Sequence, residues 1–484
     1  MDADPGLVGE LAEVLGAGLV TSPDACVAFE CDALTAHRHR PDLVALPVSV
    51  EQVQSVLRIC HRRGAPVVAR GAGTGLSGGA LPVPGGVLLV LSRLDRILEV
   101  DAVRGLARVQ PGVTNLAVSE AAAPHGLYYA PDPSSQVACS VGGNVAENSG
   151  GVHCLKYGLT VHNVLEVKVV MMDGALLAFG AETGEAPGLN LLAAVVGSEG
   201  MLGVVVEATV RLLPIPRRVE LLLAAFDSVS RCADAVGALI ASGIVPAGLE
   251  MMDAPAIRAA EAFALCGYPL EAQALLLCEV DGLDADVARE LEQARDVLGR
   301  AGATSVRVAR DAEERRRMWS GRKSAFPAVG RLAPDYYCMD GTIPRRHLAG
   351  VLERIDDLSR EHGLAVANVF HAGDGNLHPL ILFDAGRGDE LERAERFGAD
   401  ILEACVAVGG TVTGEHGVGV EKLGPMCSQF GSAELEAFHA LKRAFDPAGL
   451  LNPGKAVPTL NRCADYGAIR VHGGKLPHGH LPRF

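Results

Sequence analysis

The stretch that decides the fold is RGAGTGLSGG, residues 70–79, which follows directly after the apolar segment APVVA at 65–69. Residues 73–78 match G-x-G-x-x-G, a pattern that binds dinucleotides when a helix opens immediately behind it. Here the chain continues as PVPGG at 82–86, a sequence in which no helix can form. The match to a Rossmann site is therefore formal, although the backbone N–H groups of such a loop can still converge on an anion.

Further loops of small residues follow the first one, which on its own would indicate only a tight structural turn. They are SVGGN at 140–144, preceded by PDPSS at 131–135, then ENSGG at 147–151 and SEGMLG at 198–203. These loops supply small hydrogen-bond donors and allow the backbone to approach a flat ligand closely. No G-x-x-x-x-G-K motif occurs, which disfavours a P-loop nucleotidase.

Around these loops the pattern predicts an α+β domain that ends near residue 215, where Pro214 and Pro216 interrupt the chain. A capping-box pattern begins at Ser49, and its helix is expected to end near Gly64. The other expected elements are helices at 7–19 and 114–123, strands at 65–69, 87–92 and 204–213, and a hairpin at 97–110.

The rest of the chain predicts a second unit in which strands alternate with helices. Strand 219–226 precedes helix 228–242, and strand 273–280 precedes helix 284–302, which favours a sheet covered by helices on one face. A hairpin at 364–371 and 377–384 and a long helix at 388–408 follow. The expected domains are 1–215, 216–445 and a C-terminal segment, 446–484, that returns to the first domain.

Composition narrows the class of protein. The 484 residues are 49% hydrophobic and 21% charged, which excludes bulk disorder, and the net charge of -15 makes nucleic acid an unsuitable partner. The 12 cysteines form no C-x-x-C pair, so we expect reduced thiols and no iron–sulfur cluster. We find neither a signal-peptide pattern nor an apolar run of 18 residues, and therefore expect a cytoplasmic chain that reaches a membrane only through partners.

The strongest candidates for catalytic and metal-binding residues lie in HAGDGNLH at 371–378 and TGEHGVG at 413–419. The D-G-N sequence suits a tight turn, which would bring His371 and His378 together on adjacent strands. Two imidazoles and a carboxylate form a catalytic type of metal site with open positions. A lone histidine such as His125 is better explained as a hydrogen-bonded core residue, but the set of His371, His378, Glu415 and His416 favours a shared site.

The order of the glycine loops resembles the flavin-binding domain of the vanillyl-alcohol oxidase and p-cresol methylhydroxylase superfamily. The resemblance implies an α+β fold: a two-part FAD-binding domain of the p-cresol methylhydroxylase type and a ferredoxin-like α+β cap that carries the substrate and metal sites. Because the first loop contains no histidine for a covalent tether, we expect noncovalent FAD. By this resemblance the FAD-binding residues are Arg70, Gly71, Ala72, Gly73, Thr74, Gly75, Leu76 and Ser77 at the pyrophosphate, Pro131, Ser135, Ser140, Gly142, Gly143, Asn148 and Gly150 at the isoalloxazine and ribityl groups, Gly200, Gly203 and Val204 at the adenine side, and Asn452.

The two histidine motifs resemble those of the FAD-dependent 2-hydroxyacid dehydrogenases. The resemblance implies that His371, His378 and Glu415 bind a divalent metal, commonly zinc. It places His416 as the catalytic base and Arg322, in WSGR at 319–322, as the group that binds the substrate carboxylate.

Two stretches, DYYCMDGTIP at 335–344 and LLNPGK at 450–455, are most similar to the glycolate oxidase branch of this family. Cys338 and Phe326 stand where the hydroxyglutarate branch has a lysine and a polar residue, which favours glycolate or D-lactate. The branch implies partners, a second flavin-type subunit and an iron–sulfur subunit, that take the electrons toward quinone. The alternatives are a stand-alone D-lactate or D-2-hydroxyglutarate dehydrogenase and a non-catalytic subunit that only holds FAD.

Overall fold

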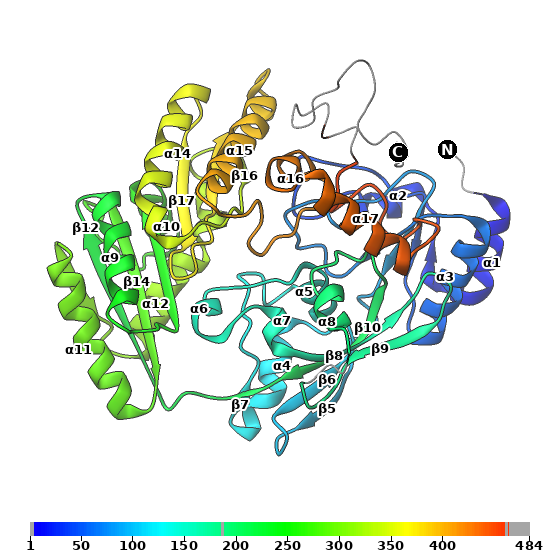
Figure 1. Cartoon of the computed structure of the whole chain (residues 1–484), viewed down its shortest axis with the longest axis horizontal. Coiled ribbons are helices and arrows are strands. Elements are labelled where there is room, and N and C mark those ends of the chain that lie inside the picture. Colours follow the sequence, from blue (N-terminus) through cyan, green and yellow to red (C-terminus); the bar gives the residue numbers. More distant parts are fainter. Residues whose placement is uncertain (1–3, 185–187, 460–462, 464–484) are drawn as a thin grey trace. The chain divides into compact units, whose positions relative to one another are not determined.

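The computed structural model describes residues 4–184, 188–459 and 463, and it divides into two compact units (Figure 1). Unit 1 comprises residues 1–150, 159–215 and 415–484, and unit 2 comprises 151–158 and 216–414. The return to unit 1 thus begins at Glu415, earlier than the expected residue 446, because Glu415 already hydrogen-bonds to Gly150 of that unit. Segment 151–158 belongs to unit 2 because its Lys156 pairs with Asp281 there.

The first sheet of unit 1 has the order β1-β2-β4-β3, with β2, β4 and β3 parallel. Its strands are β1 (Leu19–Val20), β2 (Leu43–Ala45), β3 (Val67–Arg70) and β4 (Val87–Val90). Helix α3 (Val50–Arg63) connects β2 to β3; it begins as predicted at Ser49, whose Oγ accepts the Gln52 N–H, and ends at Gly64. Helix α1 (Pro5–Leu15) packs against α3. Parallel strands need such a crossover connection, and β3 delivers the chain directly into the loop at residues 70–79.

The second sheet of unit 1 is antiparallel, in the order β5-β6-β10-β8-β9. The predicted hairpin is present as β5 (Ile97–Asp101) and β6 (Leu106–Val109), and the predicted strand as β10 (Val204–Arg211). The other strands are β8 (Val164–Val170) and β9 (Leu176–Gly180), and a separate pair is β7 (Leu127–Tyr128) with β11 (Leu213–Pro214). Helix α5 (Val141–Glu147) packs against β10, which anchors the second glycine loop to this sheet.

The remaining helices of unit 1 are short, apart from the C-terminal one. They are α2 (Pro23–Cys26), α4 (Asn115–Ala122), α7 (Thr160–Asn163), α8 (Leu191–Val195), α16 (Leu423–Gln429) and α17 (Ser432–Phe445), with 3-10 turns at Gly16–Gly18, Val27–Phe29 and Ala123–His125. The tail after α17 pairs with the first sheet, since Leu451 bridges Val67 in parallel. The described residues after α17 therefore belong to unit 1.

Unit 2 contains a seven-stranded antiparallel sheet in the order β15-β12-β14-β13-β17-β18-β16. The strands are β12 (Arg218–Phe226), β13 (Gly248–Asp253), β14 (Ala274–Gly282), β15 (Ser305–Val308), β16 (Asp335–Cys338), β17 (Val366–His371) and β18 (Pro379–Phe383). The first four strands, numbered in chain order, lie as 4-1-3-2 with helices after the first and third, which is the ferredoxin-like arrangement expected.

Helices cover both faces of this sheet, so the expectation of helices on one face is wrong. One face carries α9 (Val229–Ala241), α11 (Asp284–Arg300), α14 (Leu348–His362) and α15 (Glu390–Ala407); the other carries α10 (Ala254–Ala264), α12 (Ala312–Lys323) and α13 (Ala325–Val329). The unit also holds α6 (Cys154–Tyr157) and a 3-10 turn at Arg345–His347. The physical reason lies in β12 and β14, where adjacent residues are all buried and thus require cover on both sides.

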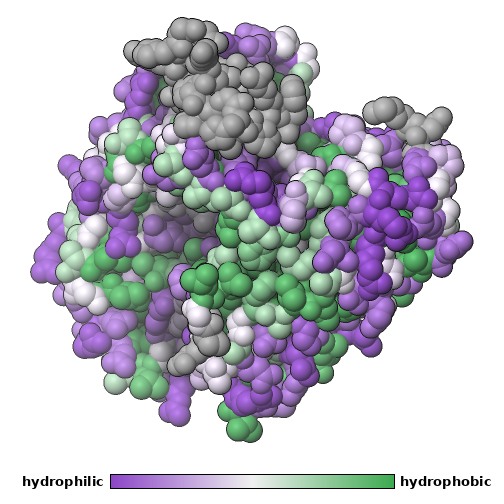
Figure 2. Space-filling view, turned by 45° about the vertical axis from the view of Figure 1, so that its right-hand side comes forward, coloured by the Kyte–Doolittle hydropathy of each residue, from purple (hydrophilic) through white to green (hydrophobic). Residues whose placement is uncertain are grey.

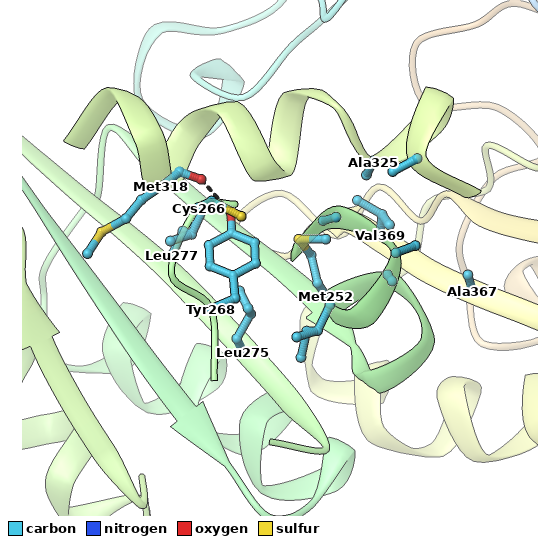
Figure 3. Packing of buried hydrophobic residues seen from close by; sticks show 14 of the residues in the cluster. Met252, Cys266, Tyr268, Leu275, Leu277, Met318, Ala325, Ala367 and Val369 are labelled. Carbon is cyan, nitrogen blue, oxygen red and sulfur yellow. Dashed lines mark hydrogen bonds between the residues drawn. The ribbon is translucent and has the colours of Figure 1, made fainter. Parts of the chain in front are cut away.

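One apolar core cluster of unit 2 lies between the sheet and α10, α12 and α13. Figure 3 shows Met252, Leu275 and Leu277 from the strands packed beside Tyr268, whose hydroxyl donates to the Met318 carbonyl. Burial of apolar surface in such a cluster stabilises the folded unit by roughly 25 cal/mol per Å² removed from water. This packing fixes α12, the helix that carries Arg322.

Cys427 and Cys463 form a disulfide across a sequence separation of 36 residues, whereas the other ten cysteines are free thiols. The expectation that all cysteines are reduced is therefore wrong for this pair, which no local motif marks. Figure 2 shows one face, on which both hydrophilic and hydrophobic residues are exposed. Among the described residues, no helix is both long and apolar enough to cross a bilayer.

Candidate active site

The hairpin of β17 and β18 carries the two predicted histidine ligands. His371 ends β17 and His378 immediately precedes β18; both are buried, and their ring centroids lie 5.0 Å apart in an edge-to-face arrangement. The His371 N–H donates to the Asn376 carbonyl at 3.0 Å, which closes the turn between them. The prediction that the turn brings these imidazoles together is confirmed.

The turn requires glycine at position 375. Gly375 has a φ of +84°, and a Cβ there would lie 2.2 Å from the backbone oxygen of Ile343. Asp374 Oδ1 accepts the Asn376 N–H at 3.0 Å, as Asp commonly does in turns. These constraints hold the two imidazoles at a fixed spacing.

Asp340 fastens the turn to the segment that leads to the second motif. Its Oδ1 accepts from Asn376 Nδ2 at 3.0 Å, and its Oδ2 accepts from Thr413 Oγ1 at 2.6 Å and from the Gly414 N–H at 3.1 Å. Glu415 follows Gly414 through a single peptide bond, which separates consecutive Cα atoms by about 3.8 Å. The chain itself therefore tethers the third predicted ligand to the hairpin.

Arg322 lies on α12 and is almost fully buried, with 1% of its side chain exposed. Its Nη2 is 2.7 Å from Glu250 Oε2, and Glu250 Oε1 is 2.8 Å from His371 Nδ1. Among the described residues, no group is within hydrogen-bond geometry of Arg322 Nε. The predicted carboxylate-binding group is thus linked to the histidine pair through Glu250.

An aromatic wall borders His378 within unit 2. The Phe326 ring lies 6.2 Å from the His378 ring and 6.1 Å from the Tyr336 ring, in each case nearly edge-on, as aromatic pairs prefer. Cys338 is buried on β16 and belongs to the same core cluster. Phe326 and Cys338, the two positions whose residues argue against a second substrate carboxylate, therefore both lie in the apolar surroundings of the hairpin.

Within unit 1, the loop after Gly414 is held by Glu199. Glu199 accepts the N–H groups of Val418 and Gly419, each at 2.7 Å, and Lys422 Nζ donates to the Gly417 carbonyl at 2.9 Å. Glu415 Oε2 accepts the Gly150 N–H at 3.1 Å, and its Oε1 lies 3.9 Å from Nε2 of His416. The second motif is thereby docked onto two of the glycine loops.

The loops predicted to bind FAD converge in unit 1. A Cβ on Gly71 would lie 2.2 Å from Ser140 Oγ, so glycine is required where loop 70–79 meets the start of α5. Asn452 Nδ2 donates to the carbonyls of Gly79 and Glu199, at 3.1 and 2.6 Å. Glycines and backbone donors from four segments thus lie together, as a cradle for a flat, phosphate-bearing ligand requires.

Two family models match this sequence. The FAD binding domain matches residues 41–180, and the C-terminal domain of the FAD linked oxidases matches residues 215–456, half of the chain. The chain belongs to the FAD-linked oxidase family. It is an oxidoreductase of that family, and its N-terminal unit is an FAD-binding domain.

Relatives of the family align with nearly the whole chain. Glycolate oxidase subunit GlcD of Escherichia coli (strain K12) is 60% identical over 97% of this chain and 94% of its own length. D-lactate dehydrogenase of Anaerostipes hadrus is 30% identical over 93% of this chain and 97% of its own length. The solved structure of p-cresol methylhydroxylase covers 95% of this chain and 98% of its own, with a TM-score of 0.81 and 17% identity, which shows the shared fold.

The FAD-binding residues expected for this family differ in accessibility. Residues 71–76 are partly or fully exposed, whereas Ser77 is buried and its carbonyl accepts the Val420 N–H at 3.0 Å. Arg70 Nη1 donates to the Cys31 carbonyl at 2.7 Å. The first loop thus presents residues 71–76 outward and is anchored at both ends.

The other expected residues lie on the loops around α5, β10 and the tail. Asn148 ends α5 at a φ of +53°, and a Cβ on Gly203 would lie 2.3 Å from Val169 Cγ1. Buried members of the set are Pro131, Ser140, Gly150, Gly203, Val204 and Asn452, and partly exposed members are Ser135, Gly142, Gly143, Asn148 and Gly200.

Three residues that organise the site, Glu250, Asp340 and Glu199, have no role predicted from the sequence, although the last two lie within the quoted stretches 335–344 and 198–203. The available signal is a charge inside an otherwise apolar strand, as in GLEMMD at 248–253, where every residue is buried.

Buried charged groups also lie in unit 1. Burial raises the pKa of Glu147 well above its ordinary value, with Glu199 adding to the effect, and burial lowers the pKa of Lys455 to about 7. A buried polar cluster therefore underlies the loop at 415–419.

Proposed function

We propose that this chain oxidises a small 2-hydroxy acid, glycolate or D-lactate, to the corresponding 2-oxo acid. The observation that carries the proposal is the buried His371–His378 pair, tethered by Asp340 to the segment entering Glu415, in a chain with an FAD-binding domain. The names of relatives point the same way, since one is a glycolate oxidase subunit and another a D-lactate dehydrogenase. FAD, when bound, supplies the acceptor for the hydride that leaves C2.

The FAD site fits noncovalent binding. Partly exposed glycines at 71–76 allow the backbone to approach a pyrophosphate, and the tight fit of Gly71 against Ser140 keeps two loops together. The first loop, 70–79, contains no histidine that could form a covalent bond to the flavin. We assign the cofactor contacts to this loop and to residues around α5, 198–203 and Asn452.

The donor set also fits a divalent metal, with zinc as the first candidate. His371, His378 and Glu415 would hold it, because two imidazoles and one carboxylate leave open positions for substrate. A metal bound there supplies a positive charge that acidifies a coordinated hydroxyl. Both imidazoles are buried, at 4% and 2% exposed, and Nδ1 of each faces a protein oxygen, Glu250 Oε1 for His371 and the Met339 carbonyl for His378, as is usual behind metal-binding histidines.

Arg322 and His416 perform the remaining tasks in this proposal. Arg322 binds the substrate carboxylate through its planar guanidinium, whose Nε is the unpartnered donor described above. His416 removes the proton of the 2-hydroxyl as general base. Because Phe326 and Cys338 supply no cation near His378, a second carboxylate would be poorly bound, which favours monocarboxylates.

The electrons leave through another protein in this proposal. The Escherichia coli relative is named as a subunit, which supports partner subunits here too. We expect a second flavin-type subunit and an iron–sulfur subunit that lead to quinone. The alternative of a stand-alone dehydrogenase is supported by the D-lactate dehydrogenase relative. A subunit that only holds FAD is disfavoured, because His371, His378, Glu415, His416 and Arg322 are all present.

Anaerobic flavin bleaching of the purified chain tests the proposal. Glycolate, D-lactate, L-lactate and D-2-hydroxyglutarate are added separately, and the loss of oxidised-flavin absorbance is followed. We expect rapid bleaching by glycolate or D-lactate and the slowest by D-2-hydroxyglutarate. The proposal would be contradicted if dithionite reduced the flavin and none of these acids did.

A further inference from the structure

Glu250 is a fully buried carboxylate with two charged or polar side-chain partners. It lies in the middle of β13, opposite His371 in the antiparallel register of β13 and β17. Its Oε1 is 2.8 Å from His371 Nδ1, and its Oε2 is 2.7 Å from Arg322 Nη2. One carboxylate therefore joins the proposed metal ligand to the proposed substrate-binding arginine.

Such a residue is costly to the fold unless both oxygens are used. Transfer of an ionised carboxylate into the protein interior is strongly unfavourable without partners. The neighbours of Glu250 on its strand are Leu249 and Met251, which are also buried, so water offers little compensation. An apolar residue would serve the core better, which indicates that Glu250 serves the site.

The contact with His371 also determines which ring nitrogen faces a ligand. An ionised carboxylate only accepts hydrogen bonds, so the Nδ1 that faces Glu250 carries the proton. Neutral imidazole has one protonated nitrogen, so in this tautomer the ring lone pair of His371 lies on Nε2, the atom that would coordinate a metal. A carboxylate behind a metal-binding histidine fixes the ring and strengthens its basicity.

We infer that Glu250 is a positioning residue for the active site: it orients His371 for metal binding and, through the same carboxylate, holds Arg322 in place relative to His371. The inference rests on the proposed function, because it needs His371 to be a ligand. It adds a residue from β13 that contacts neither substrate nor FAD in the scheme above.

The test compares Glu250→Gln with a matched control in the FAD-loaded protein. The control is Glu279→Gln: Glu279 is also a buried carboxylate on a central strand, β14, but it binds Trp319 Nε1 at 2.6 Å and His153 Nε2 at 3.1 Å. Zinc affinity is measured by competition with a chromophoric chelator, alongside FAD content and thermal melting. We expect Glu250→Gln to lose roughly 10–100-fold in zinc affinity with FAD retained, and Glu279→Gln to remain near wild type. Wild-type zinc affinity in Glu250→Gln would overturn the inference.

Two further variants keep the outcome decisive. Glu250→Asp retains the charge but shortens the reach, so we expect weaker zinc binding and turnover that excess zinc restores; unchanged affinity there also contradicts the inference. His371→Ala separates the two claims. If it keeps wild-type zinc affinity, the metal site of the proposed function fails together with this inference. If it loses zinc while both Glu250 variants keep it, only the role of Glu250 fails.

Discussion

Glu199 and Gly419 are joined by a buried hydrogen bond of 2.7 Å, in which a Glu199 carboxylate oxygen accepts the backbone N–H of Gly419. The other oxygen of the same carboxylate accepts the N–H of Val418 at the same distance. Glu199 adopts a φ of +51°, an uncommon conformation for a residue with a Cβ. The loop at 198–203 is thus fixed to the motif that carries Glu415 and His416.

Replacement of Glu199 by alanine should destabilise unit 1. Two buried N–H groups would lose their acceptor, and each unsatisfied donor costs about 1–3 kcal/mol. We expect the free energy of unfolding to fall by about 2 kcal/mol or more in urea titrations, with reduced turnover. Glu182→Ala is the control, because its carboxylate is exposed and pairs only with Arg104 among the contacts described for it. Equal stability of the two variants would show that Glu199 does not anchor this loop.

The turn between the histidines offers a matched pair of glycine substitutions. Gly375 and Gly409 both have a φ of +84°, so Gly→Ala introduces the same backbone strain at each. Only Gly375 would also place a Cβ against a backbone oxygen, that of Ile343, whereas nothing lies within 4 Å of the position at Gly409. We expect Gly375→Ala, and not Gly409→Ala, to lose bound zinc, as measured by elemental analysis. Equal zinc contents would contradict the rigid-turn account.

Asp253 gives a pH-dependent prediction. Burial raises the pKa of this carboxyl from 3.8 to about 6, against the bonds that it accepts from Ala256 and Asn368. The folded protein binds this proton more tightly than the unfolded chain does, so protonation of Asp253 stabilises the fold. This stabilisation is largest below about pH 4 and is lost as pH rises through about 6.

The comparison that isolates this effect is wild type against Asp253→Asn, since asparagine caps a helix as well as aspartate does. We expect the free energy of unfolding of wild type, relative to the variant, to fall with rising pH by on the order of 3 kcal/mol. Urea titrations at a series of pH values measure it. A difference that stays constant or grows with pH is the contrary result.

Phe326 should control the size of the substrate. Its ring contacts both Tyr336 and His378, at 6.1 and 6.2 Å between centroids, so Phe326→Ala opens space beside the proposed site. We expect kcat/KM for a longer 2-hydroxy acid, such as D-2-hydroxyisocaproate, to rise relative to that for glycolate, with FAD content unchanged. Tyr157→Phe, which removes a hydroxyl that donates to Asp281 on the same unit, is the control. An unchanged ratio would remove Phe326 from the specificity account.

Local patterns were sufficient to predict many of the elements. The capping box at Ser49, the hairpin at 97–110 and the turn between His371 and His378 depend on neighbouring residues, and all three are present. The helices on the second face of the unit 2 sheet were not foreseen, because the expected pattern took account of only two strand–helix repeats.

Contacts between residues far apart in the sequence could not be predicted, because local patterns do not determine which strands pair. Glu250 and His371 are 121 residues apart, and only the pairing of β13 with β17 brings them together. The Cys427–Cys463 disulfide likewise lacks a local signature. The link between the segment at 413–414 and the hairpin is also long-range, because it depends on Asp340, which binds Asn376 in the hairpin and Thr413 in the segment.

The central claim is that a 2-hydroxy acid reduces the flavin only when His371, His378 and Glu415 hold a metal. The most direct measurement is anaerobic flavin reduction by glycolate and D-lactate in zinc-loaded wild type and in metal-free His378→Ala, with dithionite as the control for a competent flavin. We predict full bleaching of wild type by at least one acid, and none of His378→Ala except by dithionite. Full reduction of the metal-free variant by substrate would contradict the account.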